Sequence, residues 1–208
     1  MAEAAWMTVQ LFAVTLILGL IVASVLTWAG FSRSALLRGF ARVYISIMRG
    51  TPLLVQLFVL YFGGPQLGLS LDAFTAGCIC FGLNIGAYIS VGMRGAILAV
   101  SPGQTEAARA LGFGRAQTMR FFILPQAAPL ILRSVGVNAV ILLKSTALVS
   151  AIGVVELTAA GQRFANATYQ PFEALGVAAV FYLALTYLVT GGVALLERRF
   201  GVEEGKPS

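Results

Sequence analysis

Lys144 is the residue of this sequence whose position most strongly suggests a chemical role. It lies near the middle of an apolar run from Leu130 to Val155, too deep for its ammonium group to reach a membrane surface easily. Ionisable groups at that depth are costly and usually face a cavity or a partner. With Ser145 and Thr146, Lys144 is expected to line a polar pathway and to bind a carboxylate; a structural lysine bonded to backbone or to another subunit is the alternative.

Three further polar side chains stand inside apolar runs. Asn84 and Tyr88 are four residues apart, so on a helix they share one face. Gln56 offers an amide within the run from Pro52 to Phe62. These groups either line the same pathway or bond between helices, as polar residues in membrane bundles do.

Enzyme chemistry is not indicated. The chain has no histidine, which is the commonest general base and metal ligand. Cys78 and Cys80 are two residues apart and do not face each other on a helix, so we expect neither a disulfide nor a metal site. No glycine-rich phosphate loop ending in Gly-Lys-Ser/Thr occurs, so this chain is not expected to bind ATP, and no cofactor is expected on it.

Composition places the chain in the membrane class. Of its 208 residues, 59% are hydrophobic and only 11% are charged, whereas about a quarter of a soluble domain is charged. No linker divides the sequence, so a single transmembrane domain over residues 1–208 is predicted. The net charge of +6 comes from basic residues that flank apolar runs. Anionic lipid headgroups explain them better than nucleic acid does.

Five membrane-spanning helices are predicted, because about 20 apolar residues cross a bilayer. The first is not a cleaved signal peptide, since it is too long and no basic residue precedes it. The second is placed from near Thr51, because a proline disfavours helix at the residue before it. Glycines of the third span, Gly77, Gly82, Gly86, Gly92 and Gly95, are expected to permit close helix packing. The spans cover residues 6–31, 51–62, 71–100, 130–155 and 173–196.

Charge asymmetry predicts the orientation in the membrane. With five spans, all but two of the basic residues fall on one side, which should be the cytoplasm because basic residues are retained there. The N-terminus is then outside, and a short tail, residues 197–208, is cytoplasmic. Arg49 is interpreted as an interface anchor at the cytoplasmic end of the second span. The basic residues on this side are Arg33, Arg38, Arg42, Arg49, Arg94, Arg109, Arg115, Arg120, Arg133, Arg198, Arg199 and Lys206.

The segment of residues 101–125 is a polar insertion between apolar runs. Ser101, Pro102 and Gln104 predict a helix start with a capping box. Gly112 marks a turn, and a second amphipathic helix is expected over residues 115–123, ending before Pro125. Two short helices at an angle form a knob that can dock in a groove of a partner. A surface helix lying in the lipid headgroups is the alternative.

The spacing within this segment resembles the EAA loop of ABC importer permeases. Glu106-Ala107-Ala108 is followed after three residues by Gly112, and then by Leu124-Pro125. The resemblance implies that an ATPase dimer transmits its motion here. The small side chains of Ala107 and Ala108 would allow the ATPase to approach closely. The charges of Glu106 and Arg109 would set the register of this contact. The expected coupling residues are Glu106, Ala107, Ala108, Arg109, Leu111 and Gly112.

Other stretches resemble the permeases of the polar amino acid uptake family, with the MetI-like fold of five helices. These are residues 49–56, 143–150, 156–158, 161–162 and 197–199. The resemblance implies a dimer of identical or homologous permeases and a periplasmic or lipid-anchored substrate-binding protein, which would dock near Glu156 and Arg163. One position departs: Val91 stands where the family usually has an acidic residue, which is compatible with a neutral substrate or with the less specific half of a heterodimer.

The resulting hypothesis is an inner-membrane ABC importer permease for a polar amino acid or a close analogue. A small ion-coupled secondary transporter would explain the spans and Lys144, although not the EAA spacing. A structural permease half that pairs with a substrate-binding partner is the other alternative.

Overall fold

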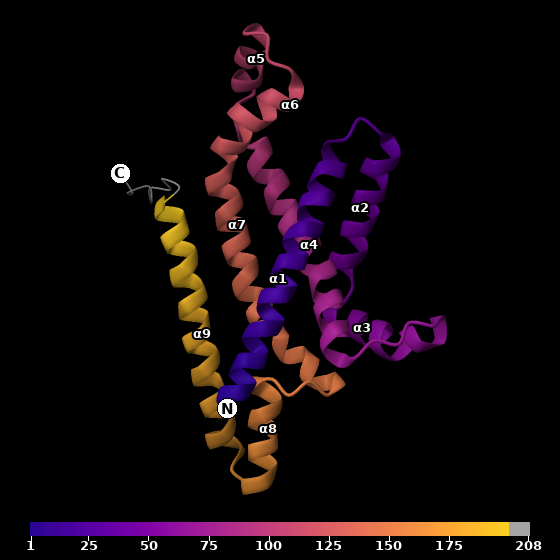
Figure 1. Cartoon of the computed structure of the whole chain (residues 1–208), viewed down its shortest axis with the longest axis vertical. Coiled ribbons are helices and arrows are strands. Elements are labelled where there is room, and N and C mark those ends of the chain that lie inside the picture. The colour runs from indigo at the N-terminus through magenta and orange to yellow at the C-terminus, as the bar shows by residue number, and fades with distance from the viewer. Residues whose placement is uncertain (200–208) are drawn as a thin grey trace.

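The computed structural model describes residues 1–199, and the predicted tail from residue 200 on, with Lys206, lies outside this range. Every regular element of the described chain is a helix (Figure 1). Its elements are α1 (Ala2–Phe31), α2 (Ala35–Gly50), α3 (Leu53–Phe58), η1 (Val59–Gly63), η2 (Gly64–Leu67), α4 (Ala73–Leu98), α5 (Pro102–Ala110), α6 (Arg115–Thr118), η3 (Met119–Ile123), α7 (Leu124–Ser145), η4 (Thr146–Ile152), α8 (Leu157–Thr168) and α9 (Pro171–Arg199).

Four stretches of the described chain are long and apolar enough to cross a membrane, namely α1, α4, residues 115–152 around α7, and α9. They run between two ends of the molecule, which we call the α5–α6 end and the α8 end (Figure 1). The predicted first, third and fifth spans are confirmed to within a few residues. The helix of the fourth begins earlier than predicted, because Pro125 lies in its first turn, where a proline is tolerated.

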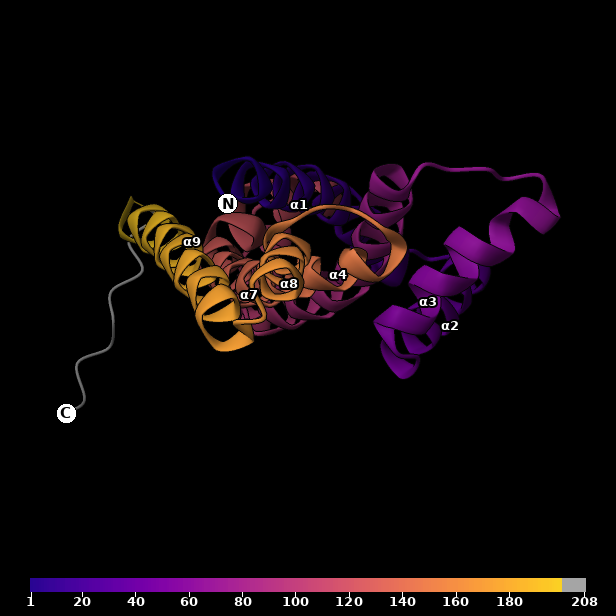
Figure 2. The same cartoon turned by 90° about the horizontal axis from the view of Figure 1, so that it is seen from below.

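The second predicted span is corrected by the structure. Its helix begins at Ala35, where the Ser34 hydroxyl accepts a hydrogen bond from the Leu37 amide, and it ends at Gly50. The apolar residues 53–67 then turn away by 104°. Pro52 lacks an amide hydrogen and cannot continue α2, so the apolar run that looked like the span is a separate arm. Figure 2 shows α2 and α3 displaced from the other helices.

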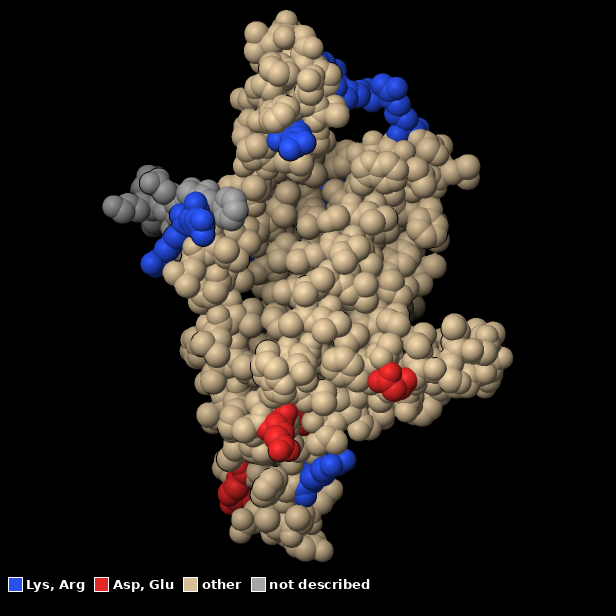
Figure 3. All heavy atoms as spheres, viewed as in Figure 1, with Lys and Arg blue, Asp and Glu red and all other residues tan. Residues whose placement is uncertain are grey.

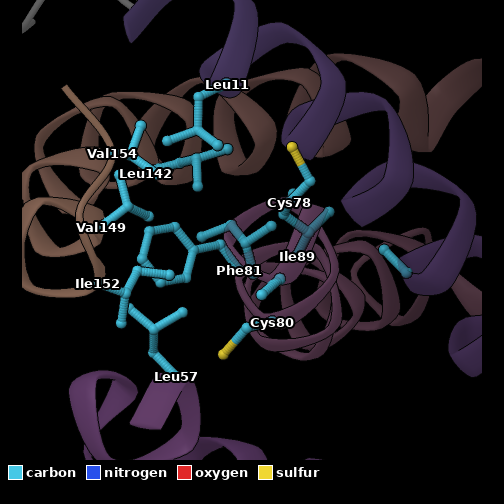
Figure 4. Close-up of a cluster of buried hydrophobic side chains, with 13 residues drawn as sticks. Leu11, Leu57, Cys78, Cys80, Phe81, Ile89, Leu142, Val149, Ile152 and Val154 are labelled. Carbon is cyan, nitrogen blue, oxygen red and sulfur yellow. The ribbon is translucent and has the colours of Figure 1, made fainter. Parts of the chain in front are cut away.

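Aromatic and aliphatic side chains of several elements meet in the largest core cluster. Phe81 of α4 is 1% exposed and lies at the centre of the view in Figure 4. Leu57 of α3, Val149 and Ile152 of η4 and Leu142 of α7 surround it. This cluster fixes the arm formed by α3 to the main bundle, and therefore fixes the position of the polar groups beside it.

Small residues allow α1 and α4 to pack closely, as predicted for membrane helices. A Cβ atom on Gly82 would lie 2.6 Å from Leu18, and one on Gly86 would lie 2.6 Å from Val22. Gly77 meets Val149 in the same way, whereas a Cβ on Gly95 would have no neighbour within 4 Å. The packing prediction is thus confirmed for Gly77, Gly82 and Gly86, and is wrong for Gly95.

Gly92 of α4 packs closely against Ser134 of α7. A Cβ added there would clash with the Ser134 hydroxyl and would lie 2.7 Å from the Ser134 Cβ, so rotating the hydroxyl would not relieve it. We expect Gly92→Ala to destabilise the protein by about 1–3 kcal/mol, as overpacking does. Thermal melting in detergent measures the loss. In the Gly92→Ala variant, a second substitution Ser134→Gly should restore stability and Ser134→Ala should not. Gly95→Ala alone should be harmless. Rescue by Ser134→Ala would contradict the contact between Gly92 and the Ser134 Cβ.

Candidate functional site: a polar cavity and an exposed coupling loop

A cavity of about 210 Å³ lies between α3, α4 and α7. Asn84, Tyr88 and Ser145 contribute its polar side chains, and Leu53 and Ile141 are among its apolar ones. We call it the polar cavity. Three of the residues predicted for the transport pathway therefore line one space, although they come from two helices that are distant in sequence.

The amides of Asn84 and Gln56 stabilise the break between α2 and α3. Because Pro52 has no amide hydrogen, the carbonyl of Met48 loses its helical partner, and such groups must be satisfied within the protein in a membrane. The Asn84 Nδ2 donates to this carbonyl at 2.8 Å and the Gln56 Nε2 at 3.0 Å. Asn84 also donates to the Gln56 Oε1 at 3.0 Å, and Gln56 donates to the Thr51 hydroxyl at 2.7 Å. Both amides thus bond between elements, and Asn84 also faces the cavity.

The three residues predicted around Lys144 occupy different environments. Lys144 is exposed and lies in the last turn of α7, not in mid-helix, because the regular helix gives way to η4 at the next residues. Ser145 lines the polar cavity, and its hydroxyl donates to the Ile141 carbonyl at 2.9 Å. Thr146 is fully buried and donates to the Leu143 carbonyl at 2.6 Å, so its expected place on the pathway is corrected.

Arg49 does not lie at the start of the second span, where the interpretation as an interface anchor had placed it. It lies in the last turn of α2, roughly 20 Å along the helix from Ala35 at a rise of 1.5 Å per residue. Its guanidinium carbon is 5.2 Å from the ring centroid of Tyr88, which lines the polar cavity. The position of Arg49 could have been found from the sequence. Ser34 can cap a helix, and the amphipathic pattern that follows it to Gly50 indicates a helix with Arg49 in its last turn.

Glu156 is also placed differently from the expectation. It was predicted to dock a binding protein, but its side chain is fully buried. Its carboxylate caps α8 by accepting from the amides of Thr158 and Ala159 at 2.8 Å each, and it accepts the Tyr182 hydroxyl at 2.6 Å. The prediction of a direct docking contact is therefore corrected: Glu156 has a structural role and joins α8 to α9. Arg163 is exposed on α8.

The predicted loop of residues 101–125 forms the tip of the molecule (Figure 1). α5 begins at Pro102 as expected, but the Ser101 side chain makes no capping bond. Gly112 adopts a φ of 83°, a left-handed conformation that favours glycine. The rings of Phe113 and Phe122 pack at 4.9 Å between centroids and hold α5 against η3. The expected second helix does not stop before Pro125 but continues through η3 into α7, so the loop joins a transmembrane helix without a break.

The predicted coupling residues divide into a surface and a support. Glu106, Ala107 and Arg109 are exposed, and Leu111 is 73% exposed although it is apolar. Ala108 is 1% exposed and its carbonyl accepts the Phe113 amide at 3.0 Å, so it fixes the turn. An exposed leucine next to an acidic and a basic side chain suits a protein contact, in which an apolar centre has a polar rim.

Basic side chains gather at the α5–α6 end, while acidic side chains and one basic patch are visible towards the α8 end (Figure 3). This agrees with the charge asymmetry read from the sequence, with Arg49 as the exception.

Near the α8 end, Asp72 caps α4 by accepting from the Thr75 amide at 3.0 Å. Hydrogen bonds from Thr75 lower the pKa of the Asp72 carboxyl.

Comparisons with known proteins identify the class. Residues 8–202 match the family described as the binding-protein-dependent transport system inner membrane component. The chain is 36% identical to the glutamine transport system permease protein of Escherichia coli strain K12, over 95% of this chain and 89% of that one. It is 37% identical to a putative glutamine transport system permease protein of Rickettsia bellii, over 95% of this chain and 91% of that one.

Solved structures show the same relationship. A crystal structure of an amino acid ABC transporter with histidines superposes with a TM-score of 0.89 at 36% identity, covering 95% of this chain and 92% of that one. A methionine ABC transporter in an inward-facing conformation gives a TM-score of 0.81 at 21% identity, covering 96% and 95%, which shows the shared fold alone.

The chain belongs to the family of inner-membrane components of binding-protein-dependent transport systems. It is a multi-pass permease subunit and not an enzyme, and the predicted all-α, MetI-like fold and inner-membrane location are confirmed.

Proposed function

We propose that this chain is the permease subunit of an ABC importer for a polar amino acid, with glutamine as the first candidate. The observation that carries the proposal is the EAA loop, which presents Leu111 and Glu106 at the tip of the molecule and continues directly into α7. Force applied to the tip would move α7, and α7 lines the polar cavity. The curated relatives named as glutamine permeases support the substrate class.

The proposed orientation puts the α5–α6 end in the cytoplasm and the N-terminus outside. Its support is the concentration of basic side chains at that end, since such residues are retained on the cytoplasmic side (Figure 3). An ATPase dimer then docks on the EAA loop and carries ATP and Mg²⁺. A substrate-binding protein docks at the α8 end, where the exposed Arg163 remains a candidate contact.

The polar cavity has the chemistry to bind a zwitterionic amino acid. Arg49 can bind a carboxylate through its guanidinium fork, and Lys144 offers a second cation near the cavity's Ser145. Asn84 and Tyr88 supply neutral polar groups for the amide of a side chain such as that of glutamine. Val91 adds no acidic charge, which suits a substrate without a positively charged side chain. In the dimer, a second permease, identical or homologous, would complete the pathway.

Purification of the tagged chain from native membranes in mild detergent tests the proposal. Mass spectrometry of the retained proteins is expected to find an ATPase with a glycine-rich phosphate loop. A second permease in the same complex would establish a heterodimer, and its absence a homodimer. Retention of no ATPase, even after gentle cross-linking, would favour an ion-coupled transporter instead.

A further inference from the structure

The bundle has an apolar groove that the proposed transport cycle does not use, and α9 forms one of its walls. α1, α4, α7 and α9 border this groove, whose volume is about 710 Å³. Its walls include Leu16 and Leu20 of α1, Ile131 and Val135 of α7, and Leu188 of α9. None of the residues that line it carries a charge. The surface is hollowed between α9 and the centre of the molecule (Figure 3).

The groove opens at the surface of the bundle and is therefore not a void within the close-packed interior. This groove is formed by membrane-spanning segments and has no polar group that could hold water. A space of this kind within the hydrocarbon layer is filled by an apolar chain.

Basic side chains stand at one end of the groove. On α9, Leu188, Gly192 and Leu196 line it at successive helical turns. Arg199 follows Leu196 by three residues and therefore lies on the same face, whereas Arg198 lies about 100° away. On α7, Leu124 lines the same end, and Arg120 precedes it by four residues. The end of the groove towards the α5–α6 end thus combines an apolar slot with cationic groups.

We propose that this groove is a binding site for an anionic phospholipid. One acyl chain occupies the slot between α7 and α9, and the guanidinium of Arg199 binds the headgroup phosphate, with Arg120 contributing to the positive field. Charge complementarity selects this occupant over a second copy of the chain, because exposed cations at the mouth of an apolar slot match the two parts of a lipid. The bound lipid would fill the space beside α7, the helix that continues from the EAA loop.

Two matched pairs of variants test the site. Gly192 lines the groove and Gly191 does not, so Gly192→Leu should fill the groove and Gly191→Leu should not. A Cβ atom at either position would meet no atom within 4 Å, so both variants should fold. Arg199→Gln removes the headgroup contact, while Arg198→Gln removes the same charge from another face of α9.

Native mass spectrometry of the purified importer, titrated with phosphatidylglycerol or phosphatidylcholine, measures the bound lipid. The unaltered complex should retain phosphatidylglycerol in preference to phosphatidylcholine. Gly192→Leu should reduce the retained lipid about tenfold, through loss of the acyl-chain contacts. Arg199→Gln should reduce it about fivefold, as expected for one basic residue at a lipid surface. Gly191→Leu and Arg198→Gln should behave like the unaltered chain.

Three results would overturn the proposal. One is equal retention of the two lipids. Another is unchanged retention in Gly192→Leu. The third is efficient disulfide cross-linking of a Gly192→Cys variant to the neighbouring permease, which would show that the second permease and not a lipid covers the groove.

Discussion

Leu111→Asp is expected to abolish ATP-driven import while leaving the permease folded. Leu111 is 73% exposed, so the substitution costs little within the chain. In the proposed complex it is buried against the ATPase, where a leucine side chain contributes about 1.5–3 kcal/mol. Burying an unpaired carboxylate in its place adds a further cost. A total loss of about 3 kcal/mol corresponds to roughly a 100-fold weaker complex.

Co-purification of the ATPase with the tagged permease measures this effect, together with substrate uptake. Leu111→Met is the matched control, because it keeps an apolar side chain of similar volume. It should retain both the ATPase and the uptake. If Leu111→Asp retained the ATPase in the same ratio as the unaltered chain, the exposed surface of the EAA loop would not be the docking surface.

Arg49→Gln is expected to weaken direct binding of the amino acid by about 10–100-fold. A hydrogen bond to a charged group contributes about 1.5–3 kcal/mol, and Arg49 is the cation placed against Tyr88 at the polar cavity. The measurement is binding of radiolabelled glutamine to the detergent-purified importer without its binding protein, so that the permease site alone is read. Arg49→Lys should give an intermediate loss, since lysine keeps the charge but lacks the guanidinium fork.

Arg42→Gln is the control for this prediction. It removes the same group from the same helix, α2, two turns nearer to the α5–α6 end, and it should bind substrate normally. A structural role for Arg49 would give a different result, namely unchanged substrate binding with a lower melting temperature.

The spans that could be predicted from the sequence are those with a continuous apolar run. α1, α4 and α9 were found in this way, because composition alone marks a helix that is apolar all round. α2 was missed because it is amphipathic, with Arg38, Arg42 and Arg49 among its apolar residues. The second span was predicted in the apolar run after Pro52 instead, although that run forms the bent arm.

The candidate site was predictable in its parts but not in its assembly. Asn84 and Tyr88 share a helical face, as their spacing indicated, and Ser145 joins them in the polar cavity. The error over α2 hid Arg49, since its place depends on where that helix begins. Glu156 could not be recognised as buried, because the partner that makes its burial possible, Tyr182, lies 26 residues away on α9.

Uptake into proteoliposomes tests the central claim most directly. The tagged complex is reconstituted, with ATP sealed inside one set of vesicles and absent from another, and glutamine and its binding protein are added outside. We predict accumulation of glutamine only when the cation-rich α5–α6 end has access to ATP, and none driven by a proton or sodium gradient alone. Accumulation driven by such a gradient in the absence of ATP would contradict the account and identify an ion-coupled transporter.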